Sequence, residues 1–556
     1  MISNDTNGMT RRLQVVLLLA FGLIWFSNLD YRKLVNPDEG RYAEIPREMV
    51  ASGDWTTPRL NDIKYFEKPA LQYWATAAAY TLFGEHQWTA RLWSALTGFL
   101  GVLMVFFTGR RLFGQEAGWN AALVLGSSLL YVLIGHINTL DMGVSFLLSA
   151  AVCAFCLAQS EVSNARKHRR WMLAAWAALA LAVLSKGLIG LVLPGAALVL
   201  YILVERDWRL PGRMHLVPGL SLFFLITVPW FVAVSLANPE FARFFFIHEH
   251  FERFLTRAHG RYQAPYYFIP VLLAGMLPWT VTLVDALARA WKREPEKSFQ
   301  VQRFLLLWAA VVFVFFSASS SKLVSYILPM IPALALLTGA RLTQLGARAL
   351  AWQTLPAALA GIALLALLPG IERYASREVP VELFRDYAVW LIAAALLQIA
   401  GAAACAWLAW RGRGAAALVV LAAAGLAFAQ LVLSGHESLS TANSAYHIAQ
   451  KIKPELKPGM PFYSVNTYDQ SLQFYLRRST TMVVYKDELG FGIAQEPEKF
   501  IADFARFEKT WNADREALAL MSRDAYDMFS AKGLPMRLVA RDTRRIIVAR
   551  HPLGNP

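Results

Sequence analysis

The stretch ALQYWATAAAYTLFG (residues 70–84) decides how this chain is threaded through a membrane. It is apolar, but its 15 residues fall short of the roughly 20 that a helix needs to cross a hydrocarbon layer of about 30 Å. It also contains Gln72 and several aromatic residues, which are typical of a helix lying in the membrane interface. We therefore expect residues 30–88 to form one long external segment with interfacial helices.

The rest of the chain consists largely of apolar runs. Of its 556 residues 56% are hydrophobic and only 17% are charged, which is typical of a protein that crosses the membrane many times. The formal net charge of +15 does not indicate nucleic acid, because the basic residues gather in loops between particular runs, as the positive-inside rule predicts. These basic clusters lie at residues 11–12, 110–111, 166–170, 206–213, 289–293, 341–348 and 411–413.

If residues 70–84 do not cross the membrane, all of these clusters fall on one side. We then predict an all-α bundle of about 13 transmembrane helices with a cytoplasmic amino terminus and an external carboxyl-terminal part, which in a bacterium lies in the periplasm. No small-x-small cleavage site follows the first span, so we expect it to remain as an anchor. The bundle takes up residues 1–435 and has a second external loop at 237–264. The expected spans are 13–29, 89–108, 117–135, 139–160, 171–186, 188–204, 215–236, 265–290, 302–318, 323–343, 350–370, 387–410 and 414–435.

The chain changes character near residue 436, where the long apolar runs end. Short alternating segments follow, so we expect residues 436–556 to form a soluble periplasmic α/β domain. It has no Gly-rich phosphate loop; we predict no nucleotide cofactor and interpret the domain as a cap over the external face. DELGFG (487–492) could contact the cleft, but we interpret it as a solvated turn. The expected strands are 460–468, 480–485, 515–521 and 544–550, and the expected helices are 442–452, 471–477 and 524–532.

The polar residues that this topology brings to the external face form the candidate site. A long cationic side chain at the end of a span costs little free energy, because it can reach the membrane interface. Acidic side chains at the same places are not explained in this way. Acids that gather there with cations therefore favour a functional site. The candidate residues are Asp38, Glu39, Arg41, Tyr65, Glu67, Lys68, Asp141, Lys186, His248, His250, Arg253, Lys322 and Tyr326.

Carboxylates held together at a membrane boundary repel one another unless cations or a metal compensate. Glu67 with His248 and His250 could bind a divalent ion such as zinc, although the helical HExxH frame is absent from the sequence. The lysines and arginines are better explained as ligands of phosphate, which needs several fixed donors when it leaves water.

These motifs together resemble the membrane-embedded GT-C glycosyltransferases that use lipid-linked sugars. The resemblance rests on the acidic pair early in the first loop, on YFEKP (65–69) and on a second acid at the outer end of a later span. LSKG (184–187), EHFERF (249–254) and SKLVSYILP (321–329) strengthen it. Within this class the chain is most similar to the bacterial lipid A 4-amino-4-deoxy-L-arabinose transferases, which belong with the protein O-mannosyltransferase-like enzymes.

The resemblance implies inverting transfer of the amino sugar from undecaprenyl phosphate to lipid A phosphates at the periplasmic face, which modifies lipopolysaccharide and confers resistance to polymyxin and cationic peptides. It implies cations at the leaving phosphate, and we expect these to be Lys68 and Arg253 with Arg41 or Lys186. The expected partners of a monomeric enzyme are the lipid-linked donor, lipid A and membrane lipids. The remaining expected roles are catalysis for Asp38, Glu39 and Asp141, and substrate binding for Tyr65, Lys322 and Tyr326.

The acceptor decides the role of Asp38. A hydroxyl acceptor, as in protein mannosylation, would require Asp38 as a general base. A lipid A phosphate is already anionic near neutral pH, so Asp38 and Asp141 would instead hold the amino sugar of the donor or orient the acceptor through a metal. Two other classes stay open: a lipid transporter, whose charges would lie near the bilayer midplane, and a lipid-binding scaffold without activity.

Overall fold

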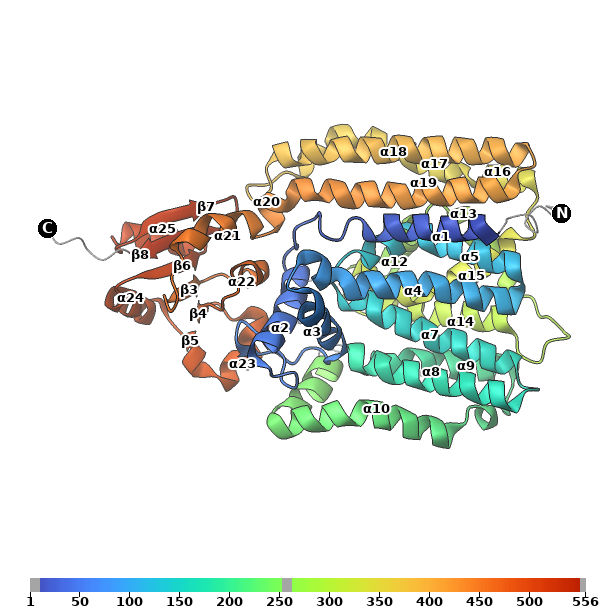
Figure 1. Ribbon diagram of the computed structural model, residues 1–556, viewed down its shortest axis with the longest axis horizontal. Coiled ribbons are helices and arrows are strands. Elements are labelled where there is room, and N and C mark those ends of the chain that lie inside the picture. Colours follow the sequence, from blue (N-terminus) through green and yellow to red (C-terminus); the bar gives the residue numbers. More distant parts are fainter. Residues whose placement is uncertain (1–10, 253–262, 551–556) are drawn as a thin grey trace.

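A bundle of long helices carries a smaller α/β domain at one end (Figure 1). The computed structural model describes residues 11–252 and 263–550. The first helix, α1, lies in the bundle and begins at the end opposite this domain (Figure 1). The elements of the bundle are α1 (Arg11–Phe26), α4 (Gln87–Phe113), α5 (Gln115–Ser127), α6 (Leu129–Gly135), α7 (Leu140–Ser160), α8 (Ala165–Lys186), α9 (Ile189–Glu205), η2 (Leu210–Arg213), α10 (Leu216–Ala237), η3 (Arg243–Glu252), η4 (Pro265–Tyr267), α12 (Phe268–Gly275), α13 (Thr280–Ala290), α14 (Val301–Ala318), η5 (Val324–Met330), α15 (Ile331–Leu342), α16 (Ala347–Gln353), α17 (Leu355–Leu367), η6 (Leu368–Tyr374), α18 (Val381–Trp410) and α19 (Gly414–Gly435).

Eight helices within the described residues are long and apolar enough to cross a membrane, and ten spans result if two bent helix pairs each count as one. The protein is therefore a multi-pass membrane protein, as the sequence predicts. α1 and α9 are apolar but shorter, and α8 begins with ARKHRR, whose charges lower its apolar character. The count of 13 spans stays a prediction.

Two of the predicted spans, 117–135 and 265–290, are each broken into two helices in the structure, a break that the sequence analysis did not predict. α5 and α6 meet at 63°, and η4–α12 meets α13 at 115°. The two breaks contact each other, because the N–H of Leu129 donates to the carbonyl of Leu277 at 3.1 Å. Irregular backbone is tolerated inside a bundle where other protein groups form hydrogen bonds with its free N–H and C=O groups. Hydropathy alone does not show which two helix breaks contact each other.

The first external segment contains two short helices and a small hairpin, namely α2 (Asp38–Ser52), β1 (Arg59–Leu60), β2 (Ile63–Lys64) and α3 (Leu71–Phe83). α3 has 13 residues and is too short to cross a bilayer, as expected for residues 70–84. Both helices lie at the end of the bundle beside the α/β domain (Figure 1). This segment therefore connects the bundle with the domain.

The C-terminal domain is built on one six-stranded sheet in the order β5-β4-β3-β6-β8-β7. Its first four strands are parallel, and β8 and β7 pair antiparallel. Apolar clusters cover both faces of the sheet, one with α21 and α22 and the other with α24 and α25. The elements are η7 (His436–Leu439), α20 (Ser440–Asn443), α21 (Tyr446–Ile452), η8 (Lys453–Glu455), β3 (Phe462–Val465), α22 (Gln470–Leu476), β4 (Thr481–Val483), η9 (Asp487–Leu489), α23 (Gly490–Gln495), η10 (Pro497–Lys499), β5 (Phe500–Ile501), α24 (Phe504–Ala513), β6 (Ala517–Met521), α25 (Arg523–Ala531), β7 (Arg537–Arg541) and β8 (Ile546–Arg550).

The four predicted strands correspond to β3, β4, β6 and β8, and the sequence missed the two edge strands. β5 has only two residues, and β7 (RLVAR) is an edge strand in which three of the five residues are exposed. Neither shows the alternation on which strand prediction depends. The α/β character of the domain is confirmed.

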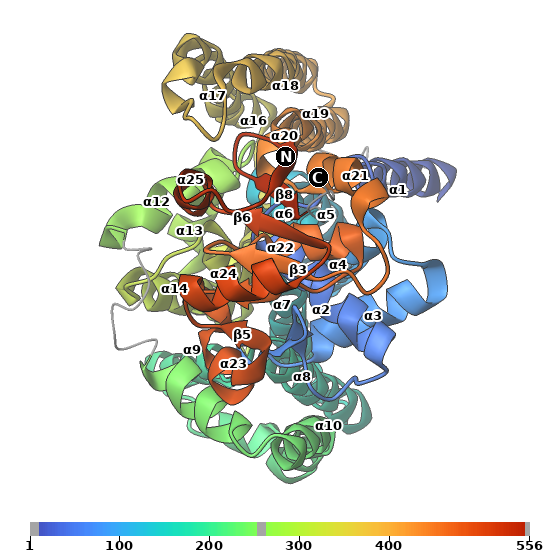
Figure 2. The same ribbon diagram turned by 90° about the vertical axis from the view of Figure 1, so that its left-hand side faces the viewer.

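The domain packs closely on the first external segment. A Cβ on Gly40 of α2 would lie 2.5 Å from the backbone nitrogen of Ser471 in α22, so only glycine fits there. The N–H of Ser471 donates to the side-chain oxygen of Asn36 at 2.9 Å. Viewed from this end, the domain lies over the middle of the bundle, and α10, α17 and α18 lie at the periphery (Figure 2).

Candidate functional site

Asp141 and Lys186 form an ion pair between two bundle helices. Asp141 lies in the first turn of α7 and Lys186 is the last residue of α8, so each charge is favoured by the dipole of its own helix. The Asp141 carboxylate also accepts a hydrogen bond from Ser325. The Lys186 ammonium lies 5.1 Å from the centre of the Tyr326 ring. The structure therefore brings together three of the predicted residues.

Lys68 lies close enough to act electrostatically on Asp141. Its ammonium donates to the Glu67 carbonyl at 2.8 Å and lies 3.9 Å from the Glu67 carboxylate. The preceding Phe66 is buried and packs edge-on against Phe241, with ring centres 5.3 Å apart. This apolar anchor fixes the YFEKP segment and positions the two charged side chains that follow it.

Arg41 joins the first external segment to the C-terminal domain. Its guanidinium pairs with Asp38 at 3.3 Å and with Glu488 of η9. Gln470 donates to the other side of Glu488 at 2.7 Å. Burial raises the pKa of Glu488, and the positive charge of Arg41 opposes part of that rise. Our interpretation of residues 487–492 as a solvated turn was wrong, because Glu488 is largely buried in a polar contact.

Three buried tyrosines surround this contact. The hydroxyls of Tyr65, Tyr73 and Tyr468 have no hydrogen-bond partner among the described residues. Each hydroxyl interacts electrostatically with both Arg41 and Glu488. Buried hydroxyls normally find a partner, so this region retains hydrogen-bonding capacity for a polar ligand or for water.

Glu39 is enclosed by the protein and is only 1% exposed. Its two oxygens accept two hydrogen bonds of 2.7 Å from Arg91 of α4, and the backbone N–H of Asn138 donates to it at 2.9 Å. Burial alone would raise its pKa, but the charge and hydrogen bonds of Arg91 outweigh burial and lower the pKa to about 2. Glu39 therefore links the start of α2 to the bundle, and no local pattern in the chain indicates Arg91 as its partner.

Acidification is expected to weaken the fold through Glu39. Its pKa in the folded protein lies below its ordinary value of 4.5, so the ionised form contributes stability above pH 4.5 that is lost as the pH falls toward 2. A shift of this size corresponds to about 3 kcal/mol. We expect thermal midpoints of the purified protein to decline over this interval and the Glu39→Gln variant to lack that component. An equal decline in the variant would assign the effect to another carboxylate.

Lys322 is held by backbone oxygens. Its ammonium donates to the carbonyls of Ser319 at 2.5 Å and Gln263 at 3.0 Å, and the residue is 5% exposed. These contacts hold the segment before η5 in place. They explain the buried position of Lys322 without a bound ligand. Its predicted role in substrate binding has no support in the geometry of the described residues.

The zinc prediction depends on side chains that lie outside the described part of the chain, those of His248 and His250. Arg253 also lies outside it. Among the described side chains no group of three or more His, Cys, Asp or Glu residues could hold a metal ion. Zinc binding stays a prediction.

The family comparisons agree with this arrangement. Residues 12–245 match the model of the dolichyl-phosphate-mannose-protein mannosyltransferases, and residues 448–550 match the aminoarabinose transferase C-terminal domain. The helical bundle and its charged cluster define a membrane glycosyltransferase. The structure superimposes on the crystal structure of ArnT from Cupriavidus metallidurans bound to undecaprenyl phosphate with a TM-score of 0.93, at 40% identity, over 97% of this chain and 98% of that chain. The chain belongs to the family of undecaprenyl phosphate-aminoarabinose arabinosyltransferases.

Relatives in other bacteria carry the same family name. The undecaprenyl phosphate-alpha-4-amino-4-deoxy-L-arabinose arabinosyl transferase of Erwinia tasmaniensis is 35% identical over 347 residues, which is 61% of each chain. A Proteus mirabilis relative is 36% identical over 59% of each chain. The match thus spans about three fifths of the length of these relatives. An Archaeoglobus fulgidus oligosaccharyltransferase, at 12% identity and a TM-score of 0.53 over 86% of this chain and 65% of that chain, shares the fold alone.

Proposed function

We propose that this protein transfers 4-amino-4-deoxy-L-arabinose from undecaprenyl phosphate to phosphate groups of lipid A at the periplasmic face of the inner membrane. The observation that carries this proposal is the likeness of 97% of this chain to an ArnT structure that holds undecaprenyl phosphate. The added amine offsets negative charge on lipopolysaccharide and so weakens the binding of polymyxin and other cationic peptides.

Cationic side chains assist the departure of the lipid phosphate. An oxygen of the acceptor phosphate attacks the anomeric carbon, the bond from this carbon to the donor phosphate oxygen breaks, and undecaprenyl phosphate leaves with the bonding electrons. Lys68 and Arg253 stabilise the charge that develops on the leaving oxygen. Lys186 is paired with Asp141, so its charge is fixed in place before substrate binds. Attack opposite to the leaving group gives inversion.

Asp38 is the acid best placed to contact a substrate. Its side chain is 40% exposed, whereas Asp141 is engaged by Lys186 and Ser325. With a phosphate acceptor no base is required, and Asp38 holds the ammonium of the amino sugar. Tyr65, whose buried hydroxyl has no protein partner among the described residues, binds a sugar hydroxyl nearby. We assign Glu39 a positioning role in place of the catalytic role expected from the sequence.

The proposed topology has 13 spans, a cytoplasmic amino terminus and a periplasmic domain from residue 436. It is supported by the basic clusters, which this threading places on one side, and by the start of α1 at the end opposite the domain (Figure 1). We propose a monomer. A zinc ion on Glu67, His248 and His250 would neutralise negative charge beside the donor, and no step above depends on it.

The direct test is label transfer from radiolabelled aminoarabinosyl undecaprenyl phosphate to lipid A by the purified protein. Lipid A from which the phosphates have been removed is the matched acceptor control. Transfer only to the phosphorylated acceptor is expected. Transfer to the dephosphorylated lipid, or to a serine- or threonine-bearing peptide, would instead support the second candidate, a related transferase with a hydroxyl acceptor.

The Asp38→Asn variant distinguishes between two roles of Asp38, binding of the sugar amine and general base catalysis. We expect the donor KM to rise roughly 10- to 100-fold, the effect of losing one hydrogen bond to a charged group, with the acidic limb of the pH-rate profile unchanged. Asp527→Asn, an exposed acid on α25, is the matched control and should behave as the unaltered protein. Loss of the acidic limb in Asp38→Asn would identify a general base and contradict the proposed role.

A further inference from the structure

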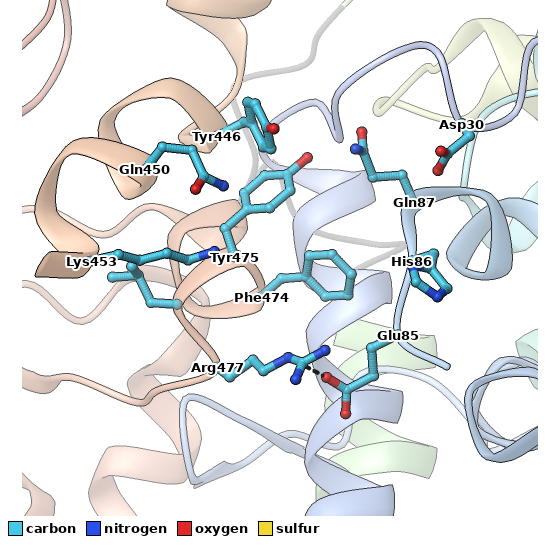
Figure 3. Close-up of a pocket in the computed structure, with 11 residues that line it drawn as sticks. Asp30, Glu85, His86, Gln87, Tyr446, Gln450, Lys453, Phe474, Tyr475 and Arg477 are labelled. Carbon is cyan, nitrogen blue, oxygen red and sulfur yellow. Dashed lines mark ion pairs between the residues drawn. The ribbon is translucent and has the colours of Figure 1, made fainter. Parts of the chain in front are cut away.

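A pocket lies between the first external segment and the C-terminal domain (Figure 3). Its volume is about 350 Å³, within the range of small-molecule sites. Asp30, Glu85 and Gln87 line it from the bundle side, and Tyr446, Lys453 and Arg477 line it from the domain. It therefore joins the two parts of the protein at a point the proposed reaction does not use.

This pocket is separate from the transferase site. Lys68 lies just before α3 and Glu85 lies just after it. A 13-residue helix is roughly 20 Å long, so the two places lie at opposite ends of that helix. A donor phosphate held at Lys68 does not reach the pocket.

The charges in the pocket are of both signs and balance. Glu85 pairs with Arg477 at 2.9 Å, and Asp30 and Lys453 add one further charge of each sign (Figure 3). A dianion such as free phosphate finds no net attraction there. A ligand that carries a phosphate and an ammonium together can pair with both signs at once. Arg477 is 65% exposed, so its side chain can turn from Glu85 to a ligand.

An acceptor group in the pocket distinguishes among ammonium ligands. The side-chain oxygen of Gln87 is buried and has no hydrogen-bond partner among the described residues. A primary ammonium has N–H groups to donate to this oxygen, whereas a quaternary ammonium has none. The pocket thus favours a primary amine over a trimethylammonium group.

The pocket lies at the level where membrane spans end. Asp30 follows α1, and Gln87 begins α4, one of the eight candidate spans. Large apolar side chains beside the pocket are exposed, namely Tyr31 at 51%, Leu82 at 73% and Phe83 at 53%. Aromatic and apolar side chains exposed next to charged ones are typical of the boundary between lipid tails and headgroups.

We propose that this pocket binds the headgroup of a phospholipid that carries one phosphate and one primary ammonium. The phosphate contacts Arg477 and Lys453, and the ammonium donates to Glu85 and to the Gln87 side-chain oxygen. The acyl chains lie along the exposed side chains of Leu82 and Phe83. Because both protein parts contact the headgroup, the lipid holds the C-terminal domain on the membrane surface.

Lipid binding by the purified full-length protein tests the proposal without any transfer assay. Native mass spectrometry in detergent would compare added phosphatidylethanolamine, phosphatidylcholine and phosphatidylglycerol. We expect about tenfold tighter binding of phosphatidylethanolamine than of the other two, and loss of about tenfold in affinity in Arg477→Ala. Arg506→Ala, an exposed arginine of α24 without a counterpart in the pocket, is the matched control and should bind normally.

Three outcomes would overturn the proposal. These are equal binding of all three lipids, unchanged affinity in Arg477→Ala, and displacement of the bound lipid by undecaprenyl phosphate, which would assign the pocket to the donor. Gln87→Leu gives a second check, since it should lower the preference for phosphatidylethanolamine over phosphatidylcholine while phosphatidylcholine binding persists. A preference that survives this change would also contradict the assignment. Failure of sugar transfer alone would leave each of these binding results intact.

Discussion

Replacing Lys68 by alanine is expected to lower the transfer rate by about 100- to 1,000-fold, the effect of removing one fixed donor from a developing negative charge. The ammonium lies beside Glu67 and acts on Asp141, so it is held in the cluster before any substrate binds. Water would have to reorient to replace it as the leaving phosphate gains charge. The rate should be measured with saturating donor, which separates a loss in kcat from weaker binding.

Lys64→Ala is the matched control for this variant. Lys64 belongs to the same external segment, but its ammonium pairs with Glu240 at 2.7 Å, and no step of the reaction is assigned to it. We expect near-normal transfer from this control and retained donor binding in Lys68→Ala. If Lys68→Ala loses donor binding with kcat unchanged, the lysine serves ground-state binding and its proposed catalytic role is wrong.

Breaking the Glu39–Arg91 pair is expected to have the largest effect on stability. Both side chains are almost completely buried, and the guanidinium also donates to the carbonyl of Leu29 at 2.7 Å. Removing one partner leaves the other as an uncompensated buried charge, which costs roughly 3–5 kcal/mol. Arg91→Met should therefore lower the free energy of unfolding by this amount in a denaturant titration of the detergent-solubilised protein.

The double variant Glu39→Gln/Arg91→Met tests the physical cause. It removes both charges of the pair together, so neither is left buried without its partner, and it should be more stable than Arg91→Met alone. Glu372→Gln removes one partner of an exposed pair with Arg385 and should leave the unfolding midpoint unchanged. Equal destabilisation in the single and double variants would show that packing around Arg91, and not the ion pair, holds α2 to the bundle.

Much of the candidate site follows from the membrane topology, which can be predicted from hydropathy. The exclusion of residues 70–84 as a span placed Lys68, Asp141 and Lys186 on one face, and the structure brings these residues together. Helix dipoles favour an acid at the start of α7 and a lysine at the end of α8, so the places of Asp141 and Lys186 could be predicted from the sequence. The family resemblance is confirmed by a nearly full-length structural match.

Other parts of the site depend on contacts between distant segments. Glu488 lies more than 400 residues from Arg41 along the chain, and its local sequence, rich in Gly and acids, is that of a surface turn. Glu39 and Asp38 are neighbours in the sequence, yet one is enclosed by Arg91 and the other is 40% exposed. Residue type alone cannot separate their roles, because the difference lies in which side of α2 faces the bundle.

Three properties could be predicted from the order of residues: the protein crosses the membrane many times, its first external segment carries the candidate chemistry, and an α/β domain follows the bundle. Apolar length, the placement of basic residues and strand alternation are local properties, so the chain displays them directly. The paired helix breaks, the burial of Glu39 and Glu488, and the pocket beside Arg477 became visible only in the folded protein. These features arise where distant segments satisfy one another's polar groups after folding, and no local pattern records such partners.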